Sequence, residues 1–238
     1  MPKSTTAALR ITALMSDGRL NSSDGIVMFD SLLYHAWFAK YAPEVFDGEE
    51  NWQSNDKKRF GLPLRQIIDQ SGYSASAGVY NGYEAIDHIH KRPDFVKYSD
   101  KLDMEKGVIS ETVGVHRAYR IPQITHIIPD KIIEFWCYGT KEKVEELLSY
   151  IPSLGKKNSI GYGFIKEWIV TECEKDYSIV HPIYGLMRPL PVEFATQYNI
   201  NPYDYEIADY AIKPPYYKAV NKRRCYIPNV KNLSHRSM

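Results

Sequence analysis

The chain has 238 residues, of which 44% are hydrophobic, and a formal net charge of +1 at pH 7. This length fits one domain, or a core domain with a substantial insertion, and provides enough chain to bury a core. The near-neutral charge excludes a protein coated with basic residues, so any nucleic-acid binding has to rest on local patches.

The cysteines and the N-terminal residues indicate the cellular compartment in which the protein works. Cys137, Cys173 and Cys225 lie far apart and show no metal-ligand spacing, so we expect free thiols, no metal and no cofactor. Residues 1–8 lack the apolar segment of a secretion signal, and no stretch approaches the roughly 18 apolar residues that cross a membrane. The prediction is a cytoplasmic protein without membrane contact.

The first elements have clear patterns. Residues 9–15 alternate apolar with small or polar residues, which predicts a strand with one buried face. In residues 29–41 the apolar residues recur at helical spacing, which predicts an amphipathic helix with Asp24 or Asp30 as its cap. For His35 inside this helix we favour a packed or surface role over acid–base chemistry on RNA.

The region of about residues 45–112 is predicted to be a long insertion. Its first part is polar, whereas residues 71–81 are rich in Gly, Ser, Ala and Tyr, which suits strands approached closely by backbone or ligand. Further on, His90, Lys91 and Arg92 are basic groups that could face RNA. A solvated face is the default alternative for them.

Residues 113–172 contain the strongest patterns. Residues 113–128 carry Arg117, Tyr119 and Arg120 among aliphatic residues, and such extended basic and aromatic residues can contact phosphate and stack on a base. The continuous apolar character of residues 131–138 predicts a central strand or one buried on both faces. A helix from Thr140, its expected N-cap, to Pro152 and a closing strand at residues 164–172 complete the pattern.

Residues 154–164, which we call the glycine loop, lie between that helix and the closing strand. Glycines permit positive φ and close approach, successive N–H groups form an anion-binding concavity, and lysines supply charge. It is not a nucleotide-binding P-loop, because five residues rather than four separate Gly155 from Gly161 and Tyr162 follows. Taken alone, the loop fits either an ordinary turn or a phosphate-binding site.

From residue 176 onward the prolines predict an irregular extension that packs on the core or on partners. Residues 211–238 contain seven Lys and Arg residues, including Arg223 and Arg224, and no Asp or Glu. This tail could bind nucleic acid or an acidic partner, or act as a solubilising end.

The predicted order of elements is β-α-β-β-α-β. It predicts an α+β, ferredoxin-like domain over residues 1–175, a pattern also used by RNA-recognition modules (RRM-like), with the insertion inside it and residues 176–238 as the extension.

A ferredoxin-like core whose second helix is followed by Gly-x5-Gly-x-Gly resembles the RAMP superfamily of CRISPR-associated RNA-binding proteins. Within it, the chain looks most like the type IV subunit of the Cas-five kind. The resemblance rests on residues 9–15, 24–25, 29–33, 154–163 and 187–191, and on Gly114, Arg117, Tyr119 and Pro122.

The resemblance implies a non-catalytic subunit of a type IV CRISPR ribonucleoprotein for defence against viruses and plasmids. It would bind the 5′ handle of the CRISPR RNA and cap the filament of the backbone RAMP subunit. It would also touch the large subunit and meet target DNA only indirectly.

The resemblance also assigns roles to individual residues. Gly155, Gly161 and Gly163 would shape the glycine loop. The expected contacts to phosphate or sugar are Lys156, Lys157, Asn158 and Ser159. Base contacts are assigned to Tyr162, Arg117, Tyr119 and Arg120, since single-stranded RNA exposes base faces and edges.

Two alternatives stay open. A catalytic member of the same superfamily would process CRISPR RNA without metal, with His35, or His116 beside Arg117 and Tyr119, in its site. A protein-only scaffold would use the 19 tyrosines for interfaces.

Overall fold

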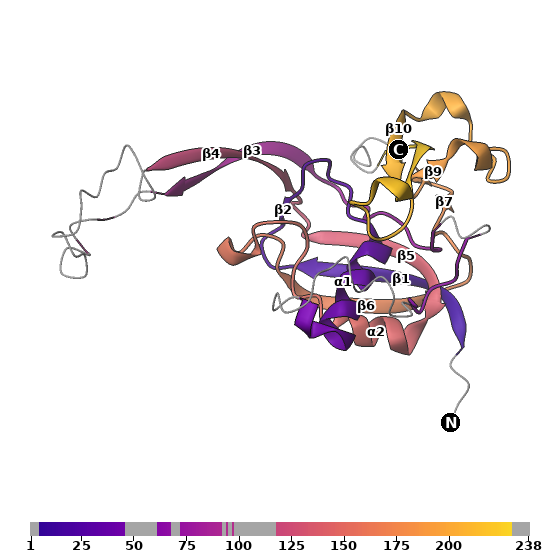
Figure 1. The fold of residues 1–238 in the computed structure, drawn as a ribbon, viewed down its shortest axis with the longest axis horizontal. Helices are drawn as coiled ribbons and strands as arrows, with labels where there is room; N and C mark the ends of the chain where they lie inside the picture. Colours follow the sequence, from indigo (N-terminus) through magenta and orange to yellow (C-terminus); the bar gives the residue numbers. More distant parts are fainter. Residues whose placement is uncertain are drawn as a thin grey trace.

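The computed structural model describes residues 5–45, 61–67, 72–91, 94, 97 and 118–229. This part of the chain combines two α-helices with small antiparallel sheets, which makes it an α+β protein. Both helices cover one face of a central sheet, a long hairpin projects to one side, and a C-terminal module lies beyond the other face (Figure 1). No helix in the described ranges has both the length and the apolar character needed to cross a membrane.

The central sheet has the strand order β5-β1-β6, with every pair antiparallel. These strands are β1 (Thr6–Met15), β5 (Ile132–Thr140) and β6 (Ile165–Cys173). They confirm the three strands that the sequence predicts most clearly. The middle of β5 is buried on both faces, as its continuous apolar pattern indicates.

Residues 73–80 extend this sheet along the outer side of β5. Isolated antiparallel bridges join Ala75 to Cys137 and Val79 to Glu134, and Val79 and Glu134 exchange main-chain hydrogen bonds of 2.8 and 2.9 Å. A Cβ at Gly78 would lie 2.8 Å from the ring of Phe135, so the glycine permits the close approach that residues 71–81 predict.

Part of the region predicted as an insertion packs in the core. Leu62, Leu64, Ala75 and Tyr80 belong to the main hydrophobic core, although all four fall within residues 45–112. Their apolar side chains are spaced irregularly along the chain, and only pairing with a distant strand gives them a common buried side.

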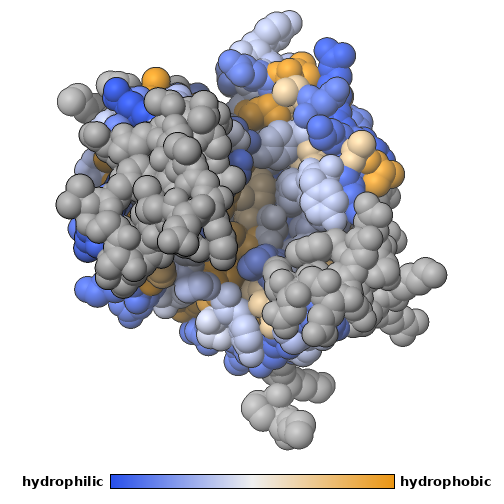
Figure 2. Space-filling view, turned by 60° about the vertical axis from the view of Figure 1, so that its left-hand side comes forward, coloured by the Kyte–Doolittle hydropathy of each residue, from blue (hydrophilic) through white to orange (hydrophobic). Residues whose placement is uncertain are grey.

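The projecting part is a hairpin of β3 (Tyr83–Lys91) and β4 (Tyr119–Ile127), joined at its base by β2 (Arg19–Asn21) in the order β2-β4-β3. Its side chains include large apolar residues that face solvent: Tyr83, Ile86, Tyr119, Ile121 and Ile124. Figure 2, viewed from the hairpin side, shows a largely hydrophilic described surface with hydrophobic side chains gathered in a central hollow.

Helix α1 (Phe29–Tyr41) has the predicted bounds, whereas its predicted caps are wrong. Met28 is the N-cap residue and supplies no side-chain hydrogen bond, while Asp30 is fully buried and serves another purpose. Helix α2 (Lys141–Leu148) follows Thr140, which occupies the predicted N-cap position without a capping side-chain bond.

The C-terminal module is more regular than predicted. Strands β9 (Leu190–Pro191), β10 (Ile207–Ala211) and β11 (Lys222–Tyr226) form a sheet of order β10-β11-β9, and β7 (Val180–His181) pairs with β8 (Gly185–Leu186). The prediction of an irregular extension is wrong here because these strands are short and separated by prolines, so no sequence period marks them. A separate hydrophobic cluster holds the module together: Ile67, Ile179, Leu186, Leu190, Ala195, Ile200 and Tyr226.

Arg188, only 1% exposed, joins this module to the core. Its guanidinium donates to the carbonyl oxygens of Tyr73, of Ala75 at 3.0 Å and of Ile212 at 2.6 Å. One guanidinium nitrogen also lies 3.5 Å from Oδ2 of the fully buried Asp30. Arg188, the basic residue of the Met-Arg-Pro-Leu-Pro stretch, therefore has a structural role inside the fold.

Candidate nucleic-acid interface

The glycine loop folds back on β2. The Lys156 amide donates to the Asn21 carbonyl at 2.9 Å, and the Gly163 amide donates to the Arg19 carbonyl at 2.8 Å. Within the loop, the Leu154 amide donates to the Gly163 carbonyl at 2.9 Å. Main-chain bonds thus hold both ends of the loop, and its middle is left to project.

The three glycines of the loop differ in the space that surrounds them. Gly155, Gly161 and Gly163 all have positive φ, at 71°, 93° and 71°. A Cβ at Gly155 would lie 2.6 Å from the Asn21 carbonyl oxygen, and one at Gly163 would lie 1.9 Å from the Leu154 carbonyl oxygen. A Cβ at Gly161 would meet nothing within 4 Å. Two glycines therefore permit packing, and the third serves only the turn.

The crest of the loop, residues 155–160, is exposed. Lys157 is left-handed with φ 67°, and a short 3₁₀ turn, Asn158–Ile160, follows it. The amides of residues 157–159 donate to no main-chain acceptor within the described ranges. Lys156 and Lys157 likewise have no acidic partner there. Exposed amides beside unpaired lysines suit a polyanion.

Tyr162 links the loop to the hairpin and is only 4% exposed. Its hydroxyl donates to Oδ2 of Asp87 on β3, and the Arg19 guanidinium lies over its ring at 4.4 Å from the centroid. The hydrogen bond from Tyr162, followed by one from the His88 amide, lowers the pKa of Asp87. The ring is thus covered by the fold, and the base contact that the resemblance implies for Tyr162 stays a prediction.

The residues that support Tyr162 were missed in the sequence. Arg19 is held by Asp17, whose Oδ2 accepts from its Nε at 2.7 Å. Because β2 has three residues, it carries no readable period. No sequence signal pairs Asp87 with a residue 75 positions away.

Among the hairpin candidates, His90 and Arg120 lie on a different face from the loop, whereas Tyr119, four residues from the strand partner of Asp87, shares the face of Asp87. His90 and Arg120 are opposite each other in register, and an Arg120 guanidinium nitrogen lies 3.3 Å from Nδ1 of His88. Because side chains alternate along a strand, His88 and His90 point away from the side on which Asp87 meets Tyr162. Tyr119, 38% exposed, lies opposite Lys91 at the outer end.

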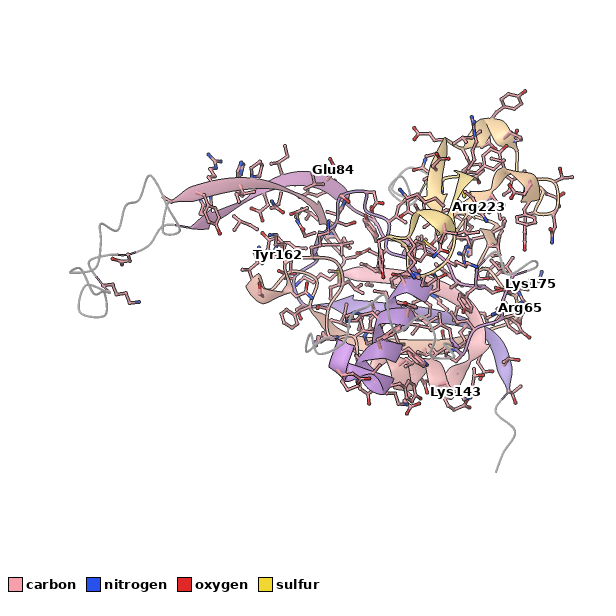
Figure 3. All side chains as sticks on the ribbon, viewed as in Figure 1. Arg65, Glu84, Lys143, Tyr162, Lys175 and Arg223 are labelled. Carbon is pink, nitrogen blue, oxygen red and sulfur yellow. The ribbon has the colours of Figure 1, made fainter. Side chains whose placement is uncertain are left out.

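The other candidates are not brought to the loop. Arg223 and Arg224 are exposed on β11, and Figure 3 shows Arg223 well apart from Tyr162. His35 lies on the exposed side of α1. Arg92, His116 and Arg117 lie outside the described residues.

The comparisons with known proteins assign the chain to a family. The family model of the CRISPR type IV associated protein Csf3 matches residues 77–228, more than half of the chain. The match begins in the segment beside β5 and includes the hairpin, the glycine loop and Arg188. No curated protein matches the chain. The chain therefore belongs to the CRISPR type IV associated Csf3 family.

Proposed function

We propose that the chain is a non-catalytic RNA-binding subunit of a type IV CRISPR ribonucleoprotein and that its glycine loop holds the 5′ handle of the CRISPR RNA. Membership of the Csf3 family is the reason for placing the chain in a type IV CRISPR complex. The observation that carries the proposal is the crest of the glycine loop, where Lys156 and Lys157 are exposed on a backbone bonded to β2.

The strand order supports a ferredoxin-like RAMP core for residues 1–175. With residues 75–79 as its outer strand, the sheet has the order 75–79, β5, β1, β6, all antiparallel. Helix α1 connects β1 to residues 75–79, and α2 connects β5 to β6. This order supports the proposed β-α-β-β-α-β core, an arrangement that RNA-recognition modules also use.

The remaining surfaces suit an assembly subunit. Phosphate contacts at the glycine loop would fix the position of the RNA, whereas reading of handle bases falls to exposed groups such as His90, Tyr119 and Arg120. The other side chains of the hairpin and the module that carries Arg223 and Arg224 are then surfaces for the backbone and large subunits, with the chain capping the filament. Target DNA is met through the guide RNA alone.

The test is the salt dependence of handle-RNA binding, measured by fluorescence anisotropy. Each phosphate contact to a single strand contributes about 0.7 to the slope of log K against log salt concentration. The double variant Lys156→Ala, Lys157→Ala is expected to weaken binding and to lower the slope by about 1.4. The matched control is Lys141→Ala, Lys175→Ala, which removes two lysines outside the loop. An unchanged slope in the loop variant would remove these lysines from the RNA site.

A second assay separates this proposal from the endoribonuclease alternative. Purified protein incubated with CRISPR repeat RNA is expected to leave the RNA intact. Cleavage that disappears in His35→Ala or His116→Ala would make the chain a processing enzyme.

A further inference from the structure

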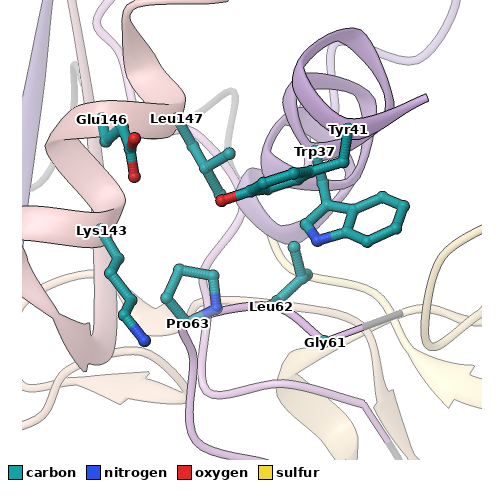
Figure 4. Close-up of a pocket in the computed structure, with 8 residues that line it drawn as sticks. All are labelled: Trp37, Tyr41, Gly61, Leu62, Pro63, Lys143, Glu146 and Leu147. Carbon is teal, nitrogen blue, oxygen red and sulfur yellow. The ribbon is translucent and has the colours of Figure 1, made fainter. Parts of the chain in front are cut away.

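A cavity of about 350 Å³ opens between the two helices. Figure 4 shows α1 and α2 on its two sides and the segment before β3 as its floor. Its lining is Trp37, Tyr41, Gly61, Leu62, Pro63, Lys143, Glu146 and Leu147. In Figure 3, Lys143 lies well apart from Tyr162 of the glycine loop, so this cavity belongs to another surface of the molecule.

The walls of the cavity are mostly apolar, and its floor is bonded to the central sheet. The rings of Trp37 and Tyr41 lie 5.3 Å apart, and Leu62 and Leu147 are 8% and 3% exposed. The floor is tied to β5, because the Thr140 amide donates to the Pro63 carbonyl at 3.0 Å. The volume falls within the range of ligand pockets, roughly 300 to 1,000 Å³.

Of the two lysines near the rim, one is paired with a carboxylate and the other is not. Lys40 makes an ion pair with Glu146, and this hydrogen bond raises the pKa of Lys40. Lys143 has no acidic partner in the described part of the chain, and its side chain extends beside Pro63 (Figure 4). One positive charge is thus left at the rim of an apolar cavity, where it would attract a carboxylate.

We infer that this cavity receives an apolar side chain from another protein subunit of the complex, with an adjacent Asp or Glu that pairs with Lys143. An apolar anchor in a preformed pocket with a charged pair at the rim is a common form of protein interface. A nucleic acid fits less well, because the lining is mostly apolar and leaves one unpaired cation, whereas a nucleic-acid site neutralises several phosphates. The site is separate from the glycine loop and does not depend on the RNA contacts proposed there.

Photo-crosslinking in the assembled complex identifies the occupant. Tyr41, 54% exposed at the cavity, is replaced by the photo-reactive residue benzoylphenylalanine, and the chain is co-expressed with its partner subunits and a CRISPR array. After irradiation, mass spectrometry is expected to find a cross-link to a segment of another subunit that has an apolar residue beside Asp or Glu. Cross-links only to RNA, to a second copy or within the chain, or no cross-link, overturn the proposal.

Two variants test the cavity without disturbing the core. Gly61→Trp places a large side chain at the cavity, and a Cβ at Gly61 meets nothing within 4 Å. Lys143→Glu reverses the rim charge, and Lys141→Glu is the matched control on the same helix.

Gly61→Trp is expected to abolish the cross-link, and Lys143→Glu to weaken association with the cross-linked subunit at least about tenfold. Lys141→Glu and the wild type should behave alike. Handle-RNA binding by the isolated chain should be unchanged in all three variants, which separates this interface from the glycine loop. Equal association of Lys143→Glu and Lys141→Glu with the cross-linked subunit overturns the role of Lys143.

Discussion

The junction around Arg188 and the crest of the glycine loop both depend on basic residues, with opposite outcomes. Arg188 is 1% exposed, and carbonyl oxygens and a buried carboxylate surround its guanidinium. Lys156 and Lys157 are exposed on a held backbone, and no acidic partner in the described ranges neutralises them. A count of basic residues therefore does not locate a binding site. Some basic side chains are buried and paired inside the fold, and others are exposed and can contact a ligand.

Replacing Arg188 should cause the largest loss in the free energy of unfolding. Arg188→Met leaves Asp30 buried without its cation, which typically costs about 3 to 5 kcal/mol of the free energy of unfolding. Arg224→Met, at an exposed position, should cost less than about 0.5 kcal/mol in the same urea titration. Equal losses in the two variants would contradict the role given to the junction.

The pH dependence of the same variant sharpens the prediction. Burial raises the pKa of Asp30 above its ordinary value of 3.8, while Arg188 and the Tyr216 hydroxyl oppose the shift. Without Arg188 the pKa rises further, so the folded state binds a proton more tightly than the unfolded state. The loss in Arg188→Met should therefore shrink as pH falls from neutral toward 3.8, and a loss independent of pH would exclude Asp30 as its cause.

Gly163→Ala should have the largest effect on the loop side. The left-handed φ costs about 1 to 2 kcal/mol for a residue with a Cβ, and the clash with the Leu154 carbonyl adds to it, for a total of about 3 kcal/mol. Gly161→Ala has the same type of φ in open space and should cost only about 1 kcal/mol. Thermal unfolding of both variants checks the ranking, and a larger cost at Gly161 would contradict the packing described for Gly163.

Tyr162→Phe should have a smaller effect. It removes the hydrogen bond to Asp87, worth about 1 kcal/mol, and keeps the buried ring. Since this bond lowers the pKa of Asp87, its contribution is present above pH 3.8 and is lost as pH falls through the folded-state pKa. The difference from the wild type should therefore be largest near neutral pH and vanish in acid. Tyr203→Phe, at a 95% exposed position, is the control that should show no change.

Lys157→Gly should have the smallest effect on stability and the opposite sign. Lys157 holds a left-handed φ of 67°, which glycine adopts without strain, so the free energy of unfolding should rise by about 0.5 kcal/mol. Handle-RNA binding should weaken in the same protein, because a charge is lost. Lys156→Gly, outside the left-handed region, should show no gain in stability. Unchanged RNA binding in Lys157→Gly would make this lysine part of the fold alone.

The sequence predicted much of the core because its periods are local. The alternation in β1, the apolar run of β5 and the helical spacing of α1 each reflect one buried face, and the structure confirms all three. The prediction failed for the caps of α1 and for the regularity of the C-terminal module. In each case the residues are stabilised by contacts with distant parts of the chain.

The sequence by itself determined the order of β1, α1, β5, α2 and β6, the position of the glycine loop between α2 and β6, and the glycines and lysines in that loop. Periodicity and residue type are local properties that a single chain displays directly. Only the tertiary structure decided that Tyr162 is buried against Asp87 and that Arg188 joins the C-terminal module to the core. It also decided that His90 and Arg120 lie on another face from the loop. These outcomes depend on which residues meet across the fold, and no local pattern contains that information.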